Sequence, residues 1–326
     1  MNRRNFITLT AAGIGAPLTA CKKAPNVTAD GKPIIRFGHF PNITHVQGLV
    51  AHQLSRQGKG WFEERLGAEI EWYVYNAGPS ATEAIFGEAL DVTYIGPSPV
   101  LNAYSKSKGT EMRVLAGAAN GGNALVVRSD AGIEKPEDFR GKKIGTPQLG
   151  NTQDVQARAW LMEHGLKITQ SGGDAFVIPT QNPDQLSLLA SKGLDAVWTV
   201  EPWVTRLELE AGAKMFLEDK DTNVTLLAAR AGWLKEQKDL AKKLLAAHIE
   251  LTAWIKANPA ETKALVKAEL TDEKLPPKDP VLDRAISRVI VTSDISRESL
   301  DKMVKSAQSA GFLKDIPALD QLLPAL

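Results

Sequence analysis

The residues of this chain that are best suited to chemistry are polar side chains and glycines in short loops that follow apolar runs. Hydroxyl and amide groups can hold an anion together with the free N–H groups of a helix N-terminus, and glycine lets the backbone come close to a ligand. The candidate binding residues are Asn42, His45, Gly78, Ser80, Gly96, Ser98, Gly121, Gly122, Asn151, Thr152, Gln153, Glu201 and Trp203. In any one loop such residues could serve only as caps and turns, but their recurrence in loop after loop favours a shared site.

Three of these candidates also have ordinary structural roles. His45 could contact a ligand or cap the helix that follows it. Glu201 could bind a cation or orient a polar group, or it could only add negative charge to a helix N-terminus, which is worth about 0.3–1 kcal/mol. Trp203 could line a cleft, as aromatic side chains do in ligand sites, or it could lie in the core.

The sequence contains no evident catalytic or metal-binding set. The five histidines are His39, His45, His52, His164 and His248, and none forms a pair of metal-ligand spacing with a suitable third ligand. The chain has no G-x-S-x-G elbow and no P-loop. The sequence therefore predicts a binding protein, not an enzyme, without a metal ion or a cofactor.

The N-terminal segment 1–20 has the three parts of an export signal. Arg3 and Arg4, which also fit a twin-arginine signal, precede an apolar stretch that is too short to span a bilayer. Residues 18–21 (Leu-Thr-Ala-Cys) resemble a bacterial lipobox. We therefore expect a signal peptide over 1–20, a lipid on Cys21 and a polar tether over 21–32. The protein would then be periplasmic and lipid-anchored to a membrane, or at the cell surface if the source has one membrane. The alternative is an ordinary secretory peptide that leaves Cys21 free.

The composition is that of an ordinary globular protein. Without residues 1–20 the chain loses two arginines and no acids, so Lys+Arg falls from 39 to 37 against 38 Asp+Glu. This balance argues against nucleic acid as a partner, which requires a basic face. The remaining length is sufficient for two domains with their own cores. The single cysteine excludes a disulfide within the chain.

Apolar and amphipathic stretches alternate along the chain, as is typical of α/β proteins. Strands are expected at 34–38, 69–75, 91–95 and 112–119, and in a second unit at 143–146, 175–178 and 196–199. The apolar segments 124–127 and 224–227 flank the second unit and are the candidate hinge strands. Helices are expected towards the C-terminus at 238–256, 259–270, 280–290 and 297–310. This order predicts mainly parallel sheets covered by helices, in which ligands bind beyond the carboxyl ends of the strands.

Several motifs, in order along the chain, carry a resemblance to a known family. They are residues 40–45 (FPNITH), 87–92 (GEALDV), 94–99 (YIGPSP), 138–147 (DFRGKKIGTP), 194–198 (LDAVW) and 201–203 (EPW). In these motifs the chain resembles the periplasmic substrate-binding proteins of nitrate/sulfonate/taurine-type ABC transporters. The resemblance implies the two-lobed type II periplasmic-binding-protein fold, with two hinge strands. The first lobe would comprise 33–123 and 229–326, and the second lobe 124–228 including the hinge strands.

The resemblance also implies that the protein is a monomeric receptor. Its two lobes would close on a small anion or zwitterion, and the protein would deliver this ligand to an ABC permease. No lysine or arginine lies in the candidate loops, which favours a monoanion, an amine-bearing ligand or a zwitterion over a dianion. Glu201 in the cleft would oppose a second negative charge. One alternative is a tethered ligand sensor. Another is an enzyme like the thiamin-pyrimidine synthases, which resemble this scaffold. Those enzymes rely on a cysteine-rich segment, and this chain lacks one.

Overall fold

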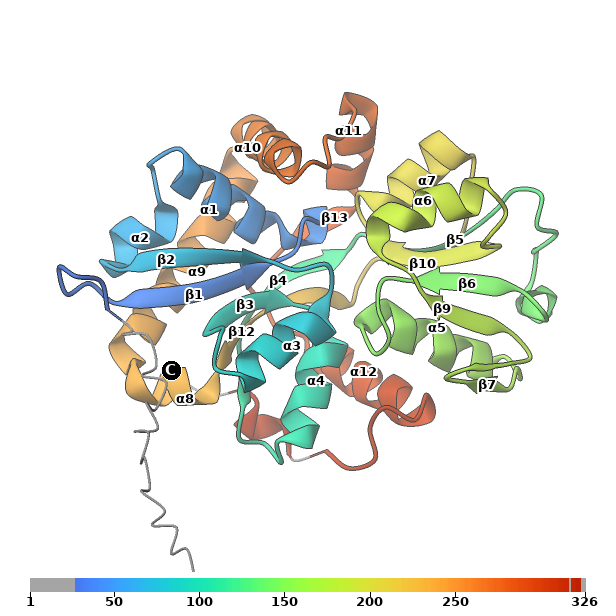
Figure 1. The fold of residues 1–326 in the computed structure, drawn as a ribbon, viewed down its shortest axis with the longest axis horizontal. Coiled ribbons are helices and arrows are strands. Elements are labelled where there is room, and N and C mark those ends of the chain that lie inside the picture. Colours follow the sequence, from blue (N-terminus) through green and yellow to red (C-terminus); the bar gives the residue numbers. More distant parts are fainter. Residues whose placement is uncertain (1–26, 317, 324–326) are drawn as a thin grey trace, which may run out of the picture.

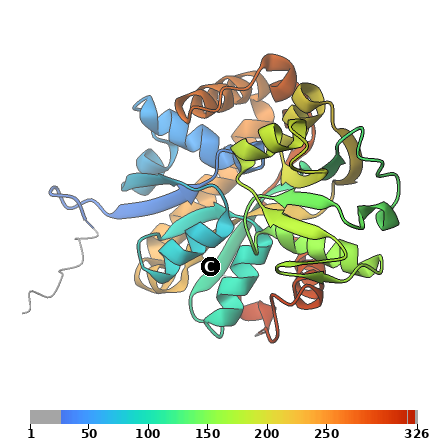
Figure 2. The ribbon, with the colours of Figure 1, turned by 45° about the vertical axis from the view of Figure 1, so that its right-hand side comes forward.

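Two α/β lobes lie side by side in the computed structural model, which describes residues 27–316 and 318–323 (Figure 1). The expected signal peptide, the lipidated Cys21 and the first part of the tether lie outside the described residues. One lobe is drawn in blue, cyan and orange, and the other in green and yellow. A turn of 45° brings the green and yellow lobe forward (Figure 2).

The larger lobe is built on a six-stranded sheet in the order β13-β4-β12-β3-β1-β2. Its strands are β1 (Ile34–His39), β2 (Glu69–Val74), β3 (Val92–Ile95), β4 (Met112–Gly121), β12 (Asn223–Arg230) and β13 (Val289–Val291). Its helices are α1 (Val46–Arg56), α2 (Trp61–Leu66), α3 (Gly78–Phe86), α4 (Pro97–Lys106), α8 (Ala231–Glu236), α9 (Lys238–Ala257), α10 (Pro259–Asp272), α11 (Asp279–Ser287) and α12 (Arg297–Ser309), with short 3-10 turns η1 (Ile43–His45) and η3 (Leu319–Gln321). One buried apolar cluster packs α1, α2, α9 and α10 on the sheet, and a second cluster packs α3, α4 and α12. Neighbouring residues of β3, Tyr94 and Ile95, belong to different clusters, so the two clusters lie on opposite faces.

The smaller lobe has a five-stranded sheet in the order β11-β5-β10-β6-β9. Its strands are β5 (Asn123–Val127), β6 (Lys143–Thr146), β9 (Phe176–Pro179), β10 (Ala196–Val200) and β11 (Lys214–Asp219), beside a small hairpin of β7 (Ile168–Thr169) and β8 (Gly172–Gly173). Its helices are α5 (Thr152–Glu163), α6 (Asn182–Ala190) and α7 (Trp203–Ala211), with the 3-10 turn η2 (Pro136–Phe139). The α/β class and the two-lobed architecture expected from the sequence are thus confirmed.

Both sheets are mixed, which corrects the expectation of mainly parallel sheets. In the larger lobe β1 pairs in parallel with β2 and β3, but β12 runs antiparallel to β3 and β4, and β13 runs antiparallel to β4. In the smaller lobe β6 pairs in parallel with β9 and β10, whereas β5 is antiparallel to β10 and β11. The physical reason is the path of the chain. Strand β4 leads the chain into the smaller lobe and β12 brings it back, so these two strands run in opposite directions.

The crossings between the lobes lie beside the expected hinge strands and not within them. The chain passes from β4 to β5 at Gly122 and returns between β11 and β12 at residues 220–222. Residues 224–227 pair with β3 and β4 inside the larger sheet, and residues 124–127 pair with β10 and β11 inside the smaller sheet. The expected lobe boundary at residue 228 therefore moves to 220–222.

Two further elements differ from the sequence-based expectation. The helix expected at 280–290 ends at Ser287, and Val289–Val291 adds β13 to the edge of the larger sheet, because these β-branched residues pair with β4. Strand β11, which was not expected, completes the smaller sheet beside β5. Within the described part of the chain, none of the helices combines the length and the apolarity needed to cross a bilayer.

A candidate ligand pocket between the lobes

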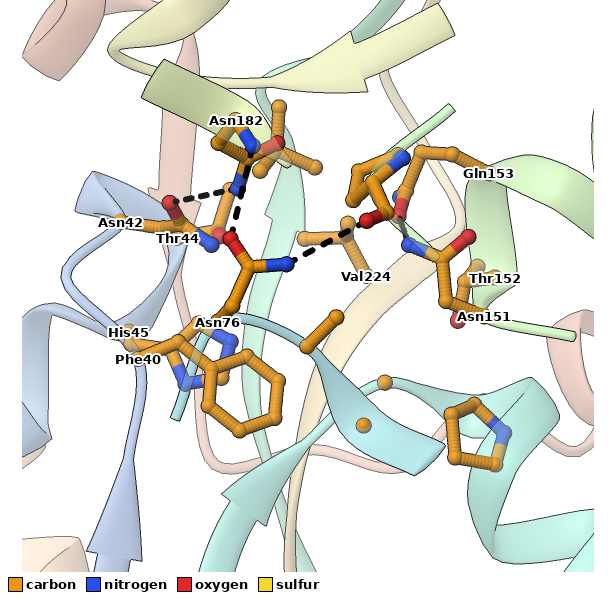
Figure 3. Close-up of a pocket in the computed structure, with 16 residues that line it drawn as sticks. Phe40, Asn42, Thr44, His45, Asn76, Asn151, Thr152, Gln153, Asn182 and Val224 are labelled. Atoms are coloured by element: carbon orange, nitrogen blue, oxygen red, sulfur yellow. Dashed lines mark hydrogen bonds between the residues drawn. The ribbon is translucent and has the colours of Figure 1, made fainter. Parts of the chain in front are cut away.

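A small polar cavity with a volume of about 30 Å³ lies between the two lobes (Figure 3). Its walls come from the loops at the carboxyl ends of the strands in both lobes and from the helices that follow them. The lining residues are Phe40, Asn42, Thr44, His45, Asn76, Ala77, Gly78, Gly96, Pro99, Pro147, Asn151, Thr152, Gln153, Asn182, Val200 and Val224. None of these described residues carries a lysine, arginine, aspartate or glutamate side chain. Seven of the thirteen sequence candidates are brought together here, namely Asn42, His45, Gly78, Gly96, Asn151, Thr152 and Gln153.

Four helices begin at the cavity, two from each lobe. Gly78 opens α3 and Gly96 caps α4 in the larger lobe, while Thr152 opens α5 and Asn182 opens α6 in the smaller lobe. The first N–H groups of a helix have no partner within the helix, and the helix dipole makes such an end partly positive. The cavity is therefore positive in character without a charged side chain.

The N-terminus of α5 lies close to the larger lobe. Asn151 Oδ1 accepts the Asp154 N–H at 2.9 Å and so caps the helix, which leaves the N–H groups of Thr152 and Gln153 without a partner inside the helix. A Cβ on Gly96 would lie 2.4 Å from Thr152 Oγ1. Glycine at position 96 therefore permits the contact between the lobes at this point.

A chain of amide groups joins the two lobes across the opposite side of the cavity (Figure 3). Asn42 Oδ1 accepts from Trp203 Nε1 at 2.9 Å and from Asn182 Nδ2 at 3.5 Å. Asn76 Nδ2 donates to the Pro147 carbonyl at 3.2 Å, and Asn76 Oδ1 accepts the Asn182 N–H at 3.4 Å. The two lobes are thus in contact around the cavity, as in a closed two-lobed binding protein.

His45 is neutral in this cavity. Burial lowers its pKa to about 3, and its ring packs against the Phe40 ring at a tilt of 33°, with the centroids 4.3 Å apart. The Nδ1 atom of His45 is buried and has no hydrogen-bond partner among the described residues. The imidazole can therefore offer one donor or one acceptor to a ligand, but no positive charge at neutral pH.

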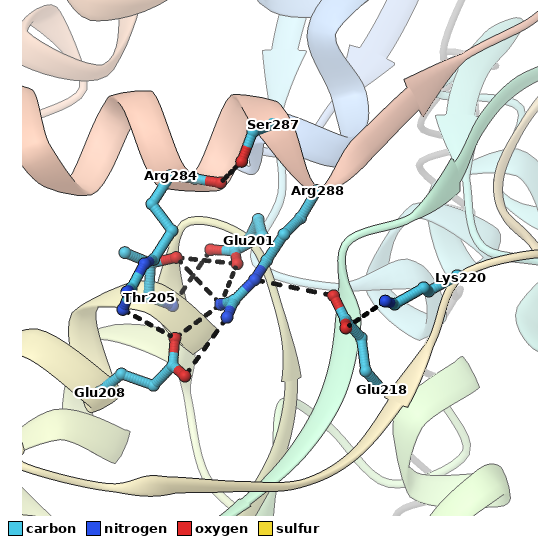
Figure 4. Close-up of polar contacts among 8 residues, drawn as sticks. All are labelled: Glu201, Thr205, Glu208, Glu218, Lys220, Arg284, Ser287 and Arg288. Atoms are coloured by element: carbon cyan, nitrogen blue, oxygen red, sulfur yellow. Dashed lines mark hydrogen bonds and ion pairs between the residues drawn. The ribbon is translucent and has the colours of Figure 1, made fainter.

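Glu201 does not line the cavity, contrary to the expectation that it would oppose a second negative charge there. The carboxylate is fully buried and accepts from the Thr205 N–H at 3.1 Å and from Thr205 Oγ1 at 2.9 Å. Arg288, which follows α11 in the larger lobe, lies 3.1 Å from Glu201 Oε1 and also binds Glu208 and Glu218 (Figure 4). Burial raises the pKa of Glu201, and the bonds from Thr205 and Arg288 oppose that rise. Its negative charge is therefore matched by Arg288 and is not presented to a ligand.

The remaining sequence candidates surround the cavity without lining it. Ser80 accepts from Gln148 Nε2 at 3.1 Å, and Ser98 Oγ donates to the Gly150 carbonyl at 3.2 Å, so both serines tie the lobes together. Trp203 does not line the cavity but donates a hydrogen bond from Nε1 to Asn42 Oδ1, and Asn42 lines it. Gly121 and Gly122 form the crossing between the lobes, with φ values of +69° and +63°. A Cβ at Gly121 would lie 2.8 Å from the Arg288 carbonyl, and one at Gly122 would lie 2.6 Å from Val289 Cγ2, so both conformation and space require glycine.

Sequence reasoning missed nine of the lining residues. They are Phe40, Thr44, Asn76, Ala77, Pro99, Pro147, Asn182, Val200 and Val224. Most lie in or beside the loops that were singled out. Asn76 and Asn182 could have been selected because Asn76 lies two residues before α3 and Asn182 is the first residue of α6. Val200 and Val224 are apolar residues in strands, and nothing in the sequence distinguishes them from the core.

Comparison with known proteins gives a consistent result. A model of the NMT1-like family matches residues 28–270. A protein of Brucella abortus (strain 2308) that is named as a binding protein is 27% identical over 272 residues, which are 80% of this chain and 77% of that protein. The taurine-binding periplasmic protein of Escherichia coli (strain K12) is 28% identical over 169 residues, 50% of this chain and 51% of that protein. The structure of the alkanesulfonate-binding protein from Xanthomonas axonopodis pv. citri bound to MOPS has a TM-score of 0.69 at 17% identity and covers 90% of this chain and 96% of that one.

Proposed function

This chain belongs to the NMT1-like family, and we propose on that basis that it is an extracytoplasmic solute receptor. In this proposal it captures a small anion or zwitterion between its two lobes and delivers it to an ABC permease. The observation that carries the proposal is the cavity at four helix N-termini, two from each lobe, because such a site can be completed only when the lobes close.

The chemistry of the cavity favours a ligand with one negative charge. Backbone N–H groups, amides and one neutral imidazole supply donors, but no described lining residue carries a full positive charge to balance a dianion. A sulfonate or nitrate group fits this requirement, and the named relatives that bind taurine or an alkanesulfonate support it. The ligand-binding residues in this proposal are the seven sequence candidates that line the cavity, together with Asn76 and Asn182.

The proposal describes a receptor and not an enzyme. Synthase-like chemistry on this scaffold would need reactive groups such as cysteines, and the single cysteine of the chain is Cys21, outside the described residues. A tethered sensor would use the same cavity and the same closure. Attachment through a lipid at Cys21 after export would keep the receptor close to its permease, in the periplasm or on the outer face of a single membrane.

A thermal-shift panel tests the proposal. Taurine, alkanesulfonates, nitrate, sulfate and pyrimidine precursors are each added to the protein that begins at residue 22. A bound ligand at 100 times its Kd should stabilise the fold by about 2.7 kcal/mol, and we expect this for a monoanion or a zwitterion more than for sulfate. No stabilisation by any member of the panel would contradict the receptor function.

Two variants test the cavity itself. Thr152→Ala and Asn182→Ala should each weaken the affinity about tenfold to a hundredfold, because a hydrogen bond to a charged group contributes about 1.5–3 kcal/mol. Ser187→Ala on the exposed side of α6 is the matched control and should leave the affinity unchanged. If Thr152→Ala and Asn182→Ala bind the ligand as the unmodified protein does, the ligand is held elsewhere.

A further inference from the structure

We propose that His39, His52 and Glu269 form a binding site for a divalent transition-metal ion, with Zn²⁺ as the best fit, inside the larger lobe. The site is distinct from the ligand pocket, since none of the three residues lines that cavity. The three side chains come from β1, α1 and α10, which are far apart in the sequence. All three residues are buried.

The three ligand atoms are close enough together to share one ion. His39 Nε2 lies 2.9 Å from His52 Nδ1 and 3.7 Å from Glu269 Oε1, and His52 Nδ1 lies 2.7 Å from the same oxygen. A circle through three atoms at these separations has a radius just below the zinc–nitrogen distance of about 2.0–2.1 Å. An ion slightly out of the plane of the three atoms can therefore lie at bonding distance from all of them.

The protons available in the cluster are too few for the atoms that meet there. His39 Nδ1 faces the Phe40 carbonyl at 3.4 Å, and because a carbonyl only accepts, this contact favours the tautomer with its proton on Nδ1 and with Nε2 as an acceptor. His39 Nε2 and Glu269 Oε1 are then both acceptors, and the single N–H of His52 Nδ1 cannot point at both. Glu269 Oε1 and Oε2 are buried and make no well-aligned hydrogen bond among the described residues, although His52 Nδ1 lies 2.7 Å from Oε1 and Arg56 Nε lies 3.2 Å from Oε2. A cation between the three atoms removes this conflict.

The groups around the cluster suit a bound metal ion. Metal-binding histidines commonly bond a carbonyl through the second ring nitrogen, as His39 does with Phe40, and metal-binding carboxylates are themselves held by a further partner. Arg56 Nε supplies that partner at 3.2 Å from Glu269 Oε2. Arg56 also pairs with Glu273, so two carboxylates share one guanidinium.

The ligand set indicates which class of ion would bind. Two imidazoles and one carboxylate favour zinc and its neighbours among the transition metals over Ca²⁺ or Mg²⁺, which prefer oxygen ligands. The ring of Trp72 stacks on His52 with the centroids 5.1 Å apart and closes one side. The His52 side chain is 11% exposed, which leaves a route for the ion and for a water molecule as the fourth ligand.

Metal content and thermal stability of the purified full chain test the site. The protein is stripped with a chelator, reloaded with Zn²⁺, freed of excess ion and analysed by elemental mass spectrometry. We expect one Zn²⁺ per chain and a melting temperature several degrees above that of the stripped protein. Substitution with Co²⁺ should give the intense visible absorption bands of a tetrahedral site, a readout that needs no variant.

Variants separate this site from surface binding. His52→Gln and Glu269→Gln should lose the stoichiometric Zn²⁺ and the rise in melting temperature, whereas His164→Gln, which alters an exposed histidine of the other lobe, should retain both. The proposal is overturned if the unmodified protein retains no Zn²⁺ and gives no cobalt bands. It is overturned equally if folded His52→Gln or Glu269→Gln binds the ion as the unmodified protein does. Neither outcome depends on the ligand pocket, which the solute panel tests separately.

Discussion

His45 is the only residue with an ionisable side chain among the described residues that line the ligand pocket. Its burial and its depressed pKa mean that the pocket keeps the same charge over the whole physiological pH range. Selection of the ligand then depends on hydrogen-bond donors and helix dipoles, which favour one negative charge. Two other buried histidines have the same direction of shift: burial lowers the pKa of His39 well below its ordinary value and lowers that of His248 to about 4.

Acid should destabilise the fold through these histidines. Because the pKa of His45 is about 3 in the folded protein and 6.5 is its ordinary value, its contribution is complete above pH 6.5 and is lost as the pH falls towards 3. One such group lowers the free energy of unfolding by about 2 kcal/mol between pH 7.5 and pH 5. We expect His45→Gln to lose less stability over this interval than the unmodified protein, by about that amount, in urea denaturation at the two pH values.

The control for this prediction is His164→Gln. His164 is exposed, so its removal should leave the pH dependence of unfolding unchanged. If His45→Gln and the unmodified protein lose stability in parallel between pH 7.5 and pH 5, then His45 is not held neutral by the fold.

At the scale of the elements, α5 is the helix whose N-terminus matters most to the pocket, because its N-cap Asn151 and its first two residues, Thr152 and Gln153, line the cavity. Asn151 fixes this end through its cap hydrogen bond to the Asp154 N–H. The larger lobe has an equivalent cap away from the cavity, where Ser296 Oγ accepts the Ser299 N–H at 3.1 Å at the start of α12. Variants at the two caps can therefore distinguish an effect on the stability of the fold from an effect on ligand affinity.

Asn151→Ala and Ser296→Ala should lower the free energy of unfolding by similar amounts, about 1 kcal/mol each, because each removes one cap. Only Asn151→Ala should also weaken ligand binding, by several-fold, since it loosens the N–H groups that face the cavity. Chemical denaturation and calorimetric titration measure the two effects. Equal ligand affinity of the two variants would indicate that the N-terminus of α5 does not hold the ligand.

The sequence predicts the elements of this fold better than it predicts their connections. The parallel strands were found with nearly correct bounds, because each is an apolar run followed by a helix, as for Lys143–Thr146. The antiparallel pairings were missed because the alternation of strands and helices does not reveal the direction of a strand within its sheet. The sequence of β12 also does not show which of the two sheets the strand joins. Val289 and Ile290 continue an amphipathic pattern, so the helix expected at 280–290 includes them, although they belong to the short strand Val289–Val291. The metal cluster could not be predicted at all, since His39, His52 and Glu269 meet only after β1, α1 and α10 have packed.

At the scale of the whole molecule, charges between the lobes stabilise the closed arrangement. Arg288 of the larger lobe lies 3.1 Å from Glu201, 2.6 Å from Glu208 and 3.6 Å from Glu218, all of the smaller lobe (Figure 4). Lys278 Nζ and Glu210 Oε1 are a further pair across the same seam, 3.3 Å apart. Because Glu201 is fully buried, loss of Arg288 would leave its charge without a counterion, and opening of the lobes would relieve this.

Arg288→Met should therefore favour the open form. We expect the ligand-free variant to have a larger radius of gyration in small-angle X-ray scattering, and to lose up to about 3 kcal/mol of stability, the cost of breaking a buried ion pair. Burial already raises the pKa of Glu201, and without Arg288 it should rise further. Glu201 would then take up a proton as the pH falls, so the cost of the substitution should shrink in acid.

The control is Arg297→Met, which removes an arginine that pairs with Asp301 and Asp320 at the surface of one lobe. Exposed pairs of this kind contribute about 0–1 kcal/mol, so the radius of gyration and the stability should change little. An Arg288→Met variant that behaves like Arg297→Met would show that the network does not hold the lobes together.

The central claim is that a small anionic group is held between the lobes by helix N-termini and neutral side chains. A crystal structure of the protein with the solute that gives the largest thermal shift tests it most directly. We predict that the anionic group lies in the cavity between the lobes, within hydrogen-bond distance of the N–H groups of Thr152 and Gln153. A ligand bound outside this cavity, or one held there by a lysine or arginine side chain, would contradict the account.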